Sequence, residues 1–248
     1  MTERAEMLAR IARRLGQPAP RDQVAWDPRA SLPERPPSIP AAELVRRFVA
    51  QLGRLGGKAI RVAADAEAVD YVLSVVAPDV VAAGRGIPPS PPAGGEAQGA
   101  AAPGPVLLWD DPLLTRLELA AALASRGVEV SVWRPDLGPA ALKELAARAR
   151  AGVTGAWWGV AETGSIALPA GPGRGRLVSL LPRTHIAVLP ESRLVPSVAE
   201  LFRHLVEEPD LPSSLALATG PSRSADIEND LSIGVHGPAD VHVVIVPG

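Results

Sequence analysis

Short apolar segments alternate with longer amphipathic segments through the middle of the chain, and this pattern restricts the fold more than any other feature. The amphipathic segments repeat with the period of an α-helix, whereas the apolar ones have the short length of buried strands. Parallel strands need helical crossovers, so the pattern predicts a mostly parallel sheet with helices on both faces. The predicted strands are residues 59–62, 80–83, 106–109 and 128–133, and the predicted helices are residues 66–76, 113–125 and 139–151.

The pattern changes after Val153, where strand-like segments follow one another with one strong helix among them. Residues 84–104, rich in Pro, Gly and Ala, are expected to form a mobile loop. The predicted fold class is α/β and three-layered, with a mixed, mostly parallel sheet, helices on both faces and an N-terminal helical extension. The later strand-like segments are residues 153–160, 165–169, 177–181, 186–189, 215–219 and 241–246, and the helix is residues 198–206.

Residues 1–55 are expected to form an N-terminal helical arm and a Pro-rich strap ahead of an α/β domain at residues 56–248. Residues 2–15 have helical spacing, and the prolines that follow cannot propagate a helix. A second helix is predicted at residues 41–55. We predict that residues 1–16 can be removed without unfolding the core, the alternative being that the first helix covers its own domain.

Composition excludes several classes of site. The 248 residues include no cysteine, so the chain has no thiolate nucleophile and no cysteine ligand for zinc or an iron–sulfur cluster. A net charge of −2 without a basic run argues against nucleic-acid binding. No apolar run reaches the roughly 18 residues of a membrane span, and the first residues are too charged for a secretory signal. These features predict a cytoplasmic protein without a membrane span.

Three polar clusters interrupt the apolar strands of the second half, and strand ends are where α/β sheets usually bind ligands. We predict that the clusters converge in one concave site, which receives a small anionic ligand through backbone N–H groups and hydroxyls. The alternative is that they are turn and capping devices. The candidate ligand-binding residues in these clusters are Glu162, Thr163 and Gly164, then Gly220, Ser222, Ser224, Asp226 and Glu228, and finally His236.

The four histidines differ in their surroundings. His185, which begins a strand, and His236, which lies in a loop bounded by Gly and Pro, are the better acid–base candidates, with a structural role as the alternative for each. His204 is predicted to face solvent and His242 to be half-buried in the last strand. No pair has the HxxxH or HxH spacing that would indicate a metal site.

Other catalytic motifs are weak. The glycine-rich segment 171–176 lacks the GxGxxG spacing of a phosphate loop, so it predicts a turn between strands, with Arg174 and Arg176 as candidates to meet an anionic ligand or partner. Lys58 and Lys143 lack the polar surroundings of a catalytic lysine. No G-x-S-x-G sequence supports a Ser-His-Asp triad.

Five motifs, taken in order, resemble the lactate-utilisation protein C family, also called the LUD-domain family. Each motif alone is weakly specific, but the ordered set is strong. Ser165 and Ser224 stand where threonine is expected in the family, and a hydroxyl is retained at both. The motifs are AETGS at 161–165, LLPRTH at 180–185, VPS at 195–197, TGPS with DIE at 219–222 and 226–228, and GVHGP at 234–238.

The resemblance implies a fold similar to the ribose-phosphate isomerase, glucosamine-phosphate deaminase and CoA-transferase group. It also implies that the chain is one of three proteins that are jointly needed to oxidise L-lactate to pyruvate. The iron–sulfur clusters are then expected on the two partner subunits. The cysteine-free composition agrees with a non-redox subunit that binds no cofactor of its own. The alternatives are a stand-alone enzyme for a phosphorylated or CoA-linked metabolite and a regulatory module that binds a small carboxylate. The resemblance assigns no catalytic residue in this chain, and whether the chain is an enzyme stays open.

Overall fold

The computed structural model describes residues 10, 12–14, 16, 32–35, 37–78, 104–225 and 231–248. Contacts divide the chain between Arg35 and Pro36, so the helix predicted at residues 41–55 lies with the α/β unit rather than with the N-terminal arm. The structure below is that of residues 36–248. Most of the helix predicted at residues 2–15, the strand predicted at 80–83 and most of the loop predicted at 84–104 lie outside the described residues.

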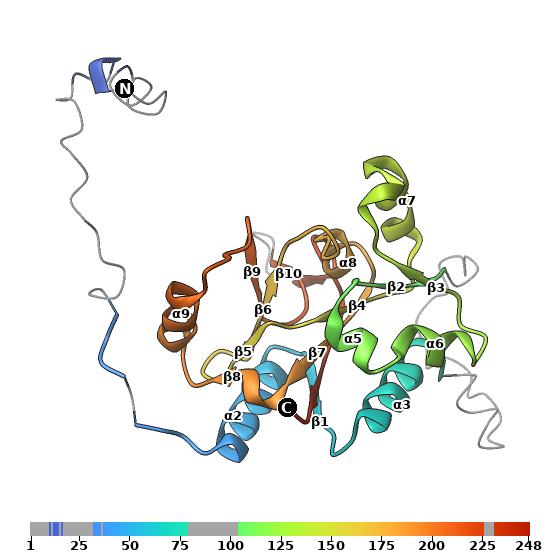
Figure 1. Ribbon diagram of the computed structural model, residues 1–248, viewed down its shortest axis with the longest axis horizontal. Coiled ribbons are helices and arrows are strands. Elements are labelled where there is room, and N and C mark those ends of the chain that lie inside the picture. The colour runs from blue at the N-terminus through green and yellow to red at the C-terminus, as the bar shows by residue number, and fades with distance from the viewer. Residues whose placement is uncertain are drawn as a thin grey trace. The chain divides into compact units, whose positions relative to one another are not determined.

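A six-stranded parallel sheet forms the centre of this unit (Figure 1). Its strands lie in the order β1-β12-β7-β4-β2-β3, and every neighbouring pair runs parallel. The strands pair in register along their apolar segments, for example Val106 with Ala151 and Val153 with Ile186. The strands are β1 (Lys58–Arg61), β2 (Val106–Leu108), β3 (Val130–Val132), β4 (Ala151–Gly155), β7 (Thr184–Pro190) and β12 (Asp240–Val246).

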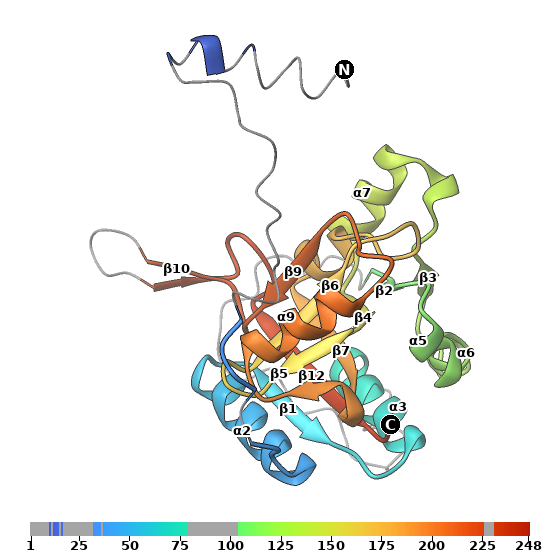
Figure 2. The same cartoon turned by 60° about the vertical axis from the view of Figure 1, so that its left-hand side comes forward.

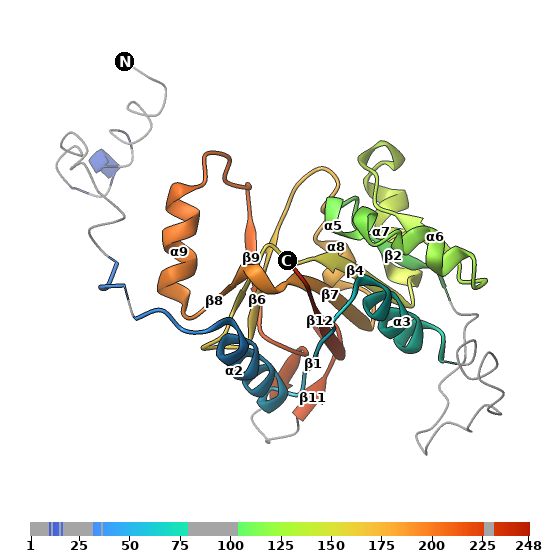
Figure 3. The same ribbon diagram turned by 60° about the horizontal axis from the view of Figure 1, so that its bottom comes forward.

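Helices cover both faces of this sheet. A Cβ atom at Gly152 would meet the backbone of Val178, whereas one at Gly155 would meet Asp111. Residues three apart in a strand point to opposite faces, so α8 and the start of α5 lie on opposite sides of β4. Figure 1 shows α3 beside α5 and α6, and Figures 1 and 3 both place α7 beside α8. The helices are α2 (Ala41–Arg54), α3 (Asp65–Val76), α5 (Pro112–Arg116), α6 (Leu119–Ala124), α7 (Pro139–Arg148) and α8 (Leu177–Leu180).

A second, four-stranded sheet has the order β8-β5-β6-β9 and packs over the parallel sheet. Its Gly159 lies against Leu189 of β7 and against Phe48 of α2, so this sheet and α2 cover the same face of the parallel sheet. A separate hairpin, β10 with β11, projects to the left in Figure 2. The remaining elements are β5 (Trp158–Val160), β6 (Ser165–Pro169), β8 (Leu194–Val195), α9 (Val198–Glu207), β9 (Leu215–Ala218), β10 (Arg223–Ala225) and β11 (Leu231–Ile233).

The predicted fold class is confirmed, and the core is mainly aliphatic, as the aromatic content of only 3% requires. Its largest fully buried side chains are almost all leucine and isoleucine, with Phe48 of α2 as the one aromatic residue in that group among the described residues. This aliphatic core joins α2, the parallel sheet and the helices on the opposite face. None of the helices in the described ranges is both long enough and apolar enough to span a membrane.

Three predicted elements are wrong in detail. The helix predicted at 113–125 is two helices, because Glu118 has a positive φ of 49° between them. The strand predicted at 177–181 is helix α8, and short buried helices and strands have the same uniform apolarity. The run 153–160 is two strands in different sheets, because the chain leaves the parallel sheet after Gly155 and enters the second sheet at Trp158.

Candidate functional site

A pocket of about 250 Å³ lies where the chain passes from one sheet to the other. At this crossing the Ala156 amide donates to Val188 O of the parallel sheet, and the Trp157 amide donates to Ala167 O of the second sheet. The pocket is bordered by residues that follow β2 and β4, whose onward connections run to opposite sides of the sheet. Ligands in open α/β sheets bind at such a switch point. We call this space the junction pocket; its charged lining residues are Asp111, Arg174 and Arg193.

Asp111 forms the inner wall of the junction pocket and is only 8% exposed. It caps α5, since its Oδ1 accepts a hydrogen bond of 2.9 Å from the Leu113 amide, and Pro112 occupies the first helical position. Gly155 makes room for this carboxylate: a Cβ atom there would lie 2.6 Å from Oδ1. The sheet therefore holds a buried carboxylate at the carboxyl ends of β2 and β4.

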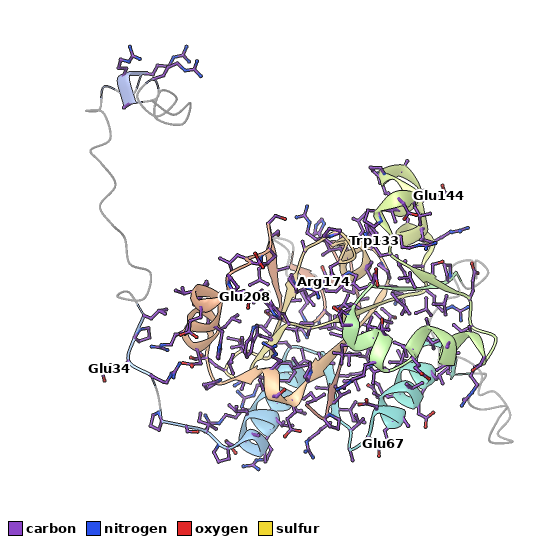
Figure 4. All side chains as sticks on the ribbon, viewed as in Figure 1. Glu34, Glu67, Trp133, Glu144, Arg174 and Glu208 are labelled. Atoms are coloured by element: carbon purple, nitrogen blue, oxygen red, sulfur yellow. The ribbon has the colours of Figure 1, made fainter. Side chains whose placement is uncertain are left out.

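Arg174 reaches Asp111 from the turn that precedes α8. Its Nε lies 3.2 Å from Oδ2 of Asp111. The turn is held to β2 by two hydrogen bonds, from the Asp110 amide to Gly173 O and from Trp109 Nε1 to Gly175 O. Trp133, labelled with Arg174 in Figure 4, packs so closely on Gly175 that no larger residue fits there. Segment 171–176 thus begins with the predicted turn, although a helix follows it instead of a strand.

Arg193 closes another side of the junction pocket from the short 3₁₀ helix η3 (Glu191–Arg193). Its guanidinium lies over the indole of Trp158, 4.7 Å from the ring centroid, which is a cation–π contact. Glu191 pairs with Arg61 of β1 at 2.6 Å and so holds the other end of η3. Stacking on an indole restricts the long arginine side chain, so Arg193 is directed rather than freely mobile.

His204 also contacts Trp158, with ring centroids 4.2 Å apart and an angle of 15° between the planes. This differs from the predicted solvent-facing position. Leu201 and Leu205 of α9 are buried, whereas Phe202 is 48% exposed. The small cluster under α9 includes Trp158, Leu201 and Leu205, and His204 stacks on Trp158 beside it.

The polar clusters predicted from the sequence are linked to one another by hydrogen bonds. Ser165 lies between Thr163 and Thr219, with hydroxyl oxygens 2.7 and 2.9 Å away. The Ser222 hydroxyl accepts a bond of 3.3 Å from the His236 amide. Gly164, with φ of 68°, lets the first cluster turn tightly against α2.

Hydrogen bonds thus join the first cluster, at Ser165, to the second, at Thr219. They also join the second cluster, at Ser222, to the third, at His236. Glu162 and His236 are exposed, and Gly220 packs beside Leu55. Asp226 and Glu228 lie outside the described residues, as does the Ser224 side chain. The expected common ligand site therefore stays a prediction.

His185 lies apart from these clusters, in the interior of the parallel sheet. It is 1% exposed, and its Nε2 is 2.9 Å from the Thr154 hydroxyl. Burial lowers the pKa of His185 to about 4, and the nearby His242 acts in the same direction. His185 is therefore neutral at physiological pH.

A second buried histidine lies at the amino ends of the strands. His242 Nδ1 is 2.9 Å from the Tyr71 hydroxyl, and its Nε2 is 3.4 Å from Asp240, which also pairs with Lys58 at 3.0 Å. Burial lowers the pKa of His242, and the Asp240 carboxylate opposes this effect. Among the described residues, no group of three or more His, Asp or Glu side chains is arranged to hold a metal ion.

Sequence reasoning did not select Asp111 or Arg193, and it selected Arg174 only as one of two candidates. A signal existed for Asp111: an Asp-Pro pair directly after a buried strand is typical of a helix start at a strand's carboxyl end. Arg193 carried no such signal, because its role depends on Trp158, which lies far earlier in the chain.

Comparisons with known proteins agree on the family and the fold. The family model for the LUD domain matches residues 45–246. Proteins named Lactate utilization protein C are similar to the chain: one from Halalkalibacterium halodurans is 40% identical over 57% of this chain and 62% of its own length. Those from a Geobacillus strain and from Bacillus subtilis are 37% and 36% identical, each over 58% of this chain and 62% of their own length.

The matched region therefore spans less than two thirds of these relatives. A crystal structure of a duf162 family protein from Deinococcus radiodurans superposes with a TM-score of 0.52 at 22% identity. That match covers 84% of this chain and 99% of the other, and it supports the same fold.

Proposed function

The chain belongs to the LUD-domain family, and from this premise we propose that it is a cytoplasmic, non-redox subunit of a system that oxidises L-lactate to pyruvate. In this proposal, iron–sulfur clusters on partner subunits carry the electrons, and this chain binds a small organic anion. The names of the relatives support the lactate part of the proposal. The lack of cysteine supports the non-redox part, since protein-bound clusters are held mainly by thiolates.

The observation that carries the binding function is the junction pocket. It lies at the switch point of the sheet and brings two guanidinium groups, of Arg174 and Arg193, to a space with one carboxylate. The excess of positive charge favours an anion, and guanidinium groups recognise carboxylates and phosphates by paired hydrogen bonds.

Gene deletion in the native host tests the system. We expect the deleted strain to lose growth on L-lactate as sole carbon source and to keep growth on pyruvate, which enters after the proposed step. The full-length gene restores growth. Unimpaired growth on L-lactate, or an equal loss on pyruvate, would contradict the proposed role.

Purification tests the partner and cofactor assignments. We expect a tagged chain from lactate-grown cells to co-purify with iron-containing proteins, while the isolated chain holds no iron and does not turn over lactate. A cluster spectrum or lactate turnover in the isolated chain would refute the non-redox assignment. A chain that purifies alone, and is stabilised by a sugar phosphate or CoA but by no carboxylate, would favour a stand-alone enzyme or regulatory module.

A further inference from the structure

The two arginines of the junction pocket differ in how far their hydrogen-bonding capacity is used. Arg174 is engaged with Asp111 through Nε. Arg193 is exposed to solvent and contacts the face of Trp158, and this cation–π contact is the interaction that its guanidinium makes among the described residues. A guanidinium that is held by stacking at the edge of a pocket can receive an anion with little loss of side-chain freedom.

The size and lining of the pocket restrict that anion. Its volume of about 250 Å³ lies below the roughly 300–1,000 Å³ of pockets for drug-sized ligands, so it suits a molecule of a few heavy atoms. Apart from the charged groups, the walls include apolar surface from Pro112, Trp157 and Pro190. A short hydrocarbon group next to a single carboxylate matches this lining better than a phosphate ion, which is polar on every side.

Asp111 adds a second requirement. Its Oδ1 accepts from the Leu113 amide and its Oδ2 faces Arg174, but a carboxylate has about four acceptor positions. Asp111 repels the carboxylate of a ligand and attracts a hydroxyl donor. A ligand is therefore oriented with its carboxylate toward Arg193 and its hydroxyl toward Asp111.

We infer that the junction pocket is a binding site for a short 2-hydroxy monocarboxylate, with Arg193 as the carboxylate anchor and Asp111 as the acceptor for the hydroxyl. The choice of lactate as the probe rests on the proposed function, whereas the site and its demand for a hydroxyl rest on the pocket. The keto acid pyruvate and the unsubstituted acid propionate both lack the hydroxyl donor and bind more weakly. A site that hydrogen-bonds a ligand hydroxyl discriminates strongly against analogues that lack it.

Isothermal titration calorimetry of the full chain tests this inference with L-lactate, pyruvate, propionate and inorganic phosphate. We expect L-lactate to bind at least about 10-fold more tightly than propionate or pyruvate. Arg193→Gln weakens both L-lactate and propionate about 10-fold or more. Asp111→Asn keeps the helix cap, because Asn caps as well as Asp, and it lowers the preference for L-lactate over propionate without weakening propionate.

The control is Arg176→Gln, which removes an exposed arginine two residues beyond Arg174 that does not line the pocket, and leaves every affinity unchanged. Equal affinity for L-lactate and propionate, or an equal effect of the Arg176 and Arg193 variants, would overturn the inference. Tight binding of phosphate without L-lactate would overturn the ligand class. Because the growth test is separate, a chain needed for growth on lactate whose pocket binds none of the four probes refutes this inference and leaves the proposed function standing.

Discussion

The junction pocket and the hydroxyl cluster of Thr163, Ser165 and Thr219 are both polar places in an aliphatic protein, yet they are built in opposite ways. In the cluster, each hydroxyl lies within 2.9 Å of another, so the polar groups satisfy one another. In the pocket, the Arg193 guanidinium stacks on the indole of Trp158, and its N–H donors remain available to a ligand.

Polar groups that hydrogen-bond to one another support the fold, whereas polar groups with unused donors can bind a ligand. Short runs of Ser, Thr and Gly are conspicuous in the sequence, but their side chains are small and find partners nearby. The pocket residues are isolated in the sequence, at positions 111, 174 and 193, and they meet where the chain passes from β4 in one sheet to β5 in the other.

The largest effect on ligand binding is expected from Gly155→Ala. The new Cβ atom would lie 2.6 Å from Oδ1 of Asp111 and must displace the carboxylate, so we expect loss of ligand binding and destabilisation of about 1–3 kcal/mol. Calorimetry and urea denaturation measure the two effects. Gly171→Ala is the matched control, since no atom of the described residues lies within 4 Å of its Cβ position. Unchanged binding in the Gly155 variant would show that the position of Asp111 does not matter.

Acid should destabilise the protein through His185. Its folded pKa of about 4 lies below the ordinary value of 6.5, so the neutral form stabilises the fold above pH 6.5, and this contribution is lost as the pH falls toward 4. The difference between these pKa values corresponds to roughly 3 kcal/mol. We expect His185→Gln, measured by urea denaturation between pH 7 and pH 4.5, to lose much of this pH dependence. His236→Gln, at an exposed loop position, should keep it; identical profiles for the two variants would refute the assignment.

Ser165→Ala should have a smaller effect and one confined to the fold. The substitution removes the central member of the hydroxyl cluster and leaves Thr163 and Thr219 without that partner, at about 1–2 kcal/mol of stability. Ligand affinity at the junction pocket should not change. If Ser165→Ala instead abolished ligand binding while the melting temperature stayed constant, the cluster would be the binding site and the comparison would be reversed.

Removing residues 1–16 should have the smallest effect. Contacts divide the chain after Arg35. The prolines between residues 1–16 and α2 prevent one continuous helix from joining the two segments. We expect a change of less than about 0.5 kcal/mol, or less than roughly 2 °C in melting temperature. Differential scanning calorimetry of the full and shortened chains measures it, and a fall of many degrees would place the first helix in the core.

Most of the fold could be predicted from the sequence, because strand and helix periodicity are local properties. The parallel strands, α3, α7 and α9 lie close to their predicted positions. The wrong predictions lie where contacts between residues distant in the sequence determine the local structure. The segment 177–181 is mainly apolar, which suits a short strand as well as a helix, and in the structure it forms α8 against Gly152. The break at Glu118 and the passage of residues 153–160 between sheets have no local period that could reveal them.

The sequence by itself determined the α/β class, the aliphatic core and the lack of any thiolate, since these follow from composition and from period along the chain. Only the tertiary structure decided which polar groups are satisfied and which are left open. Whether Arg193 finds an acceptor depends on where Trp158 and Asp111 lie in space, and their separation along the chain gives no measure of that. Hydrogen bonds form over about 3 Å and charges interact over roughly 10 Å, so folding selects the groups that remain available for a ligand.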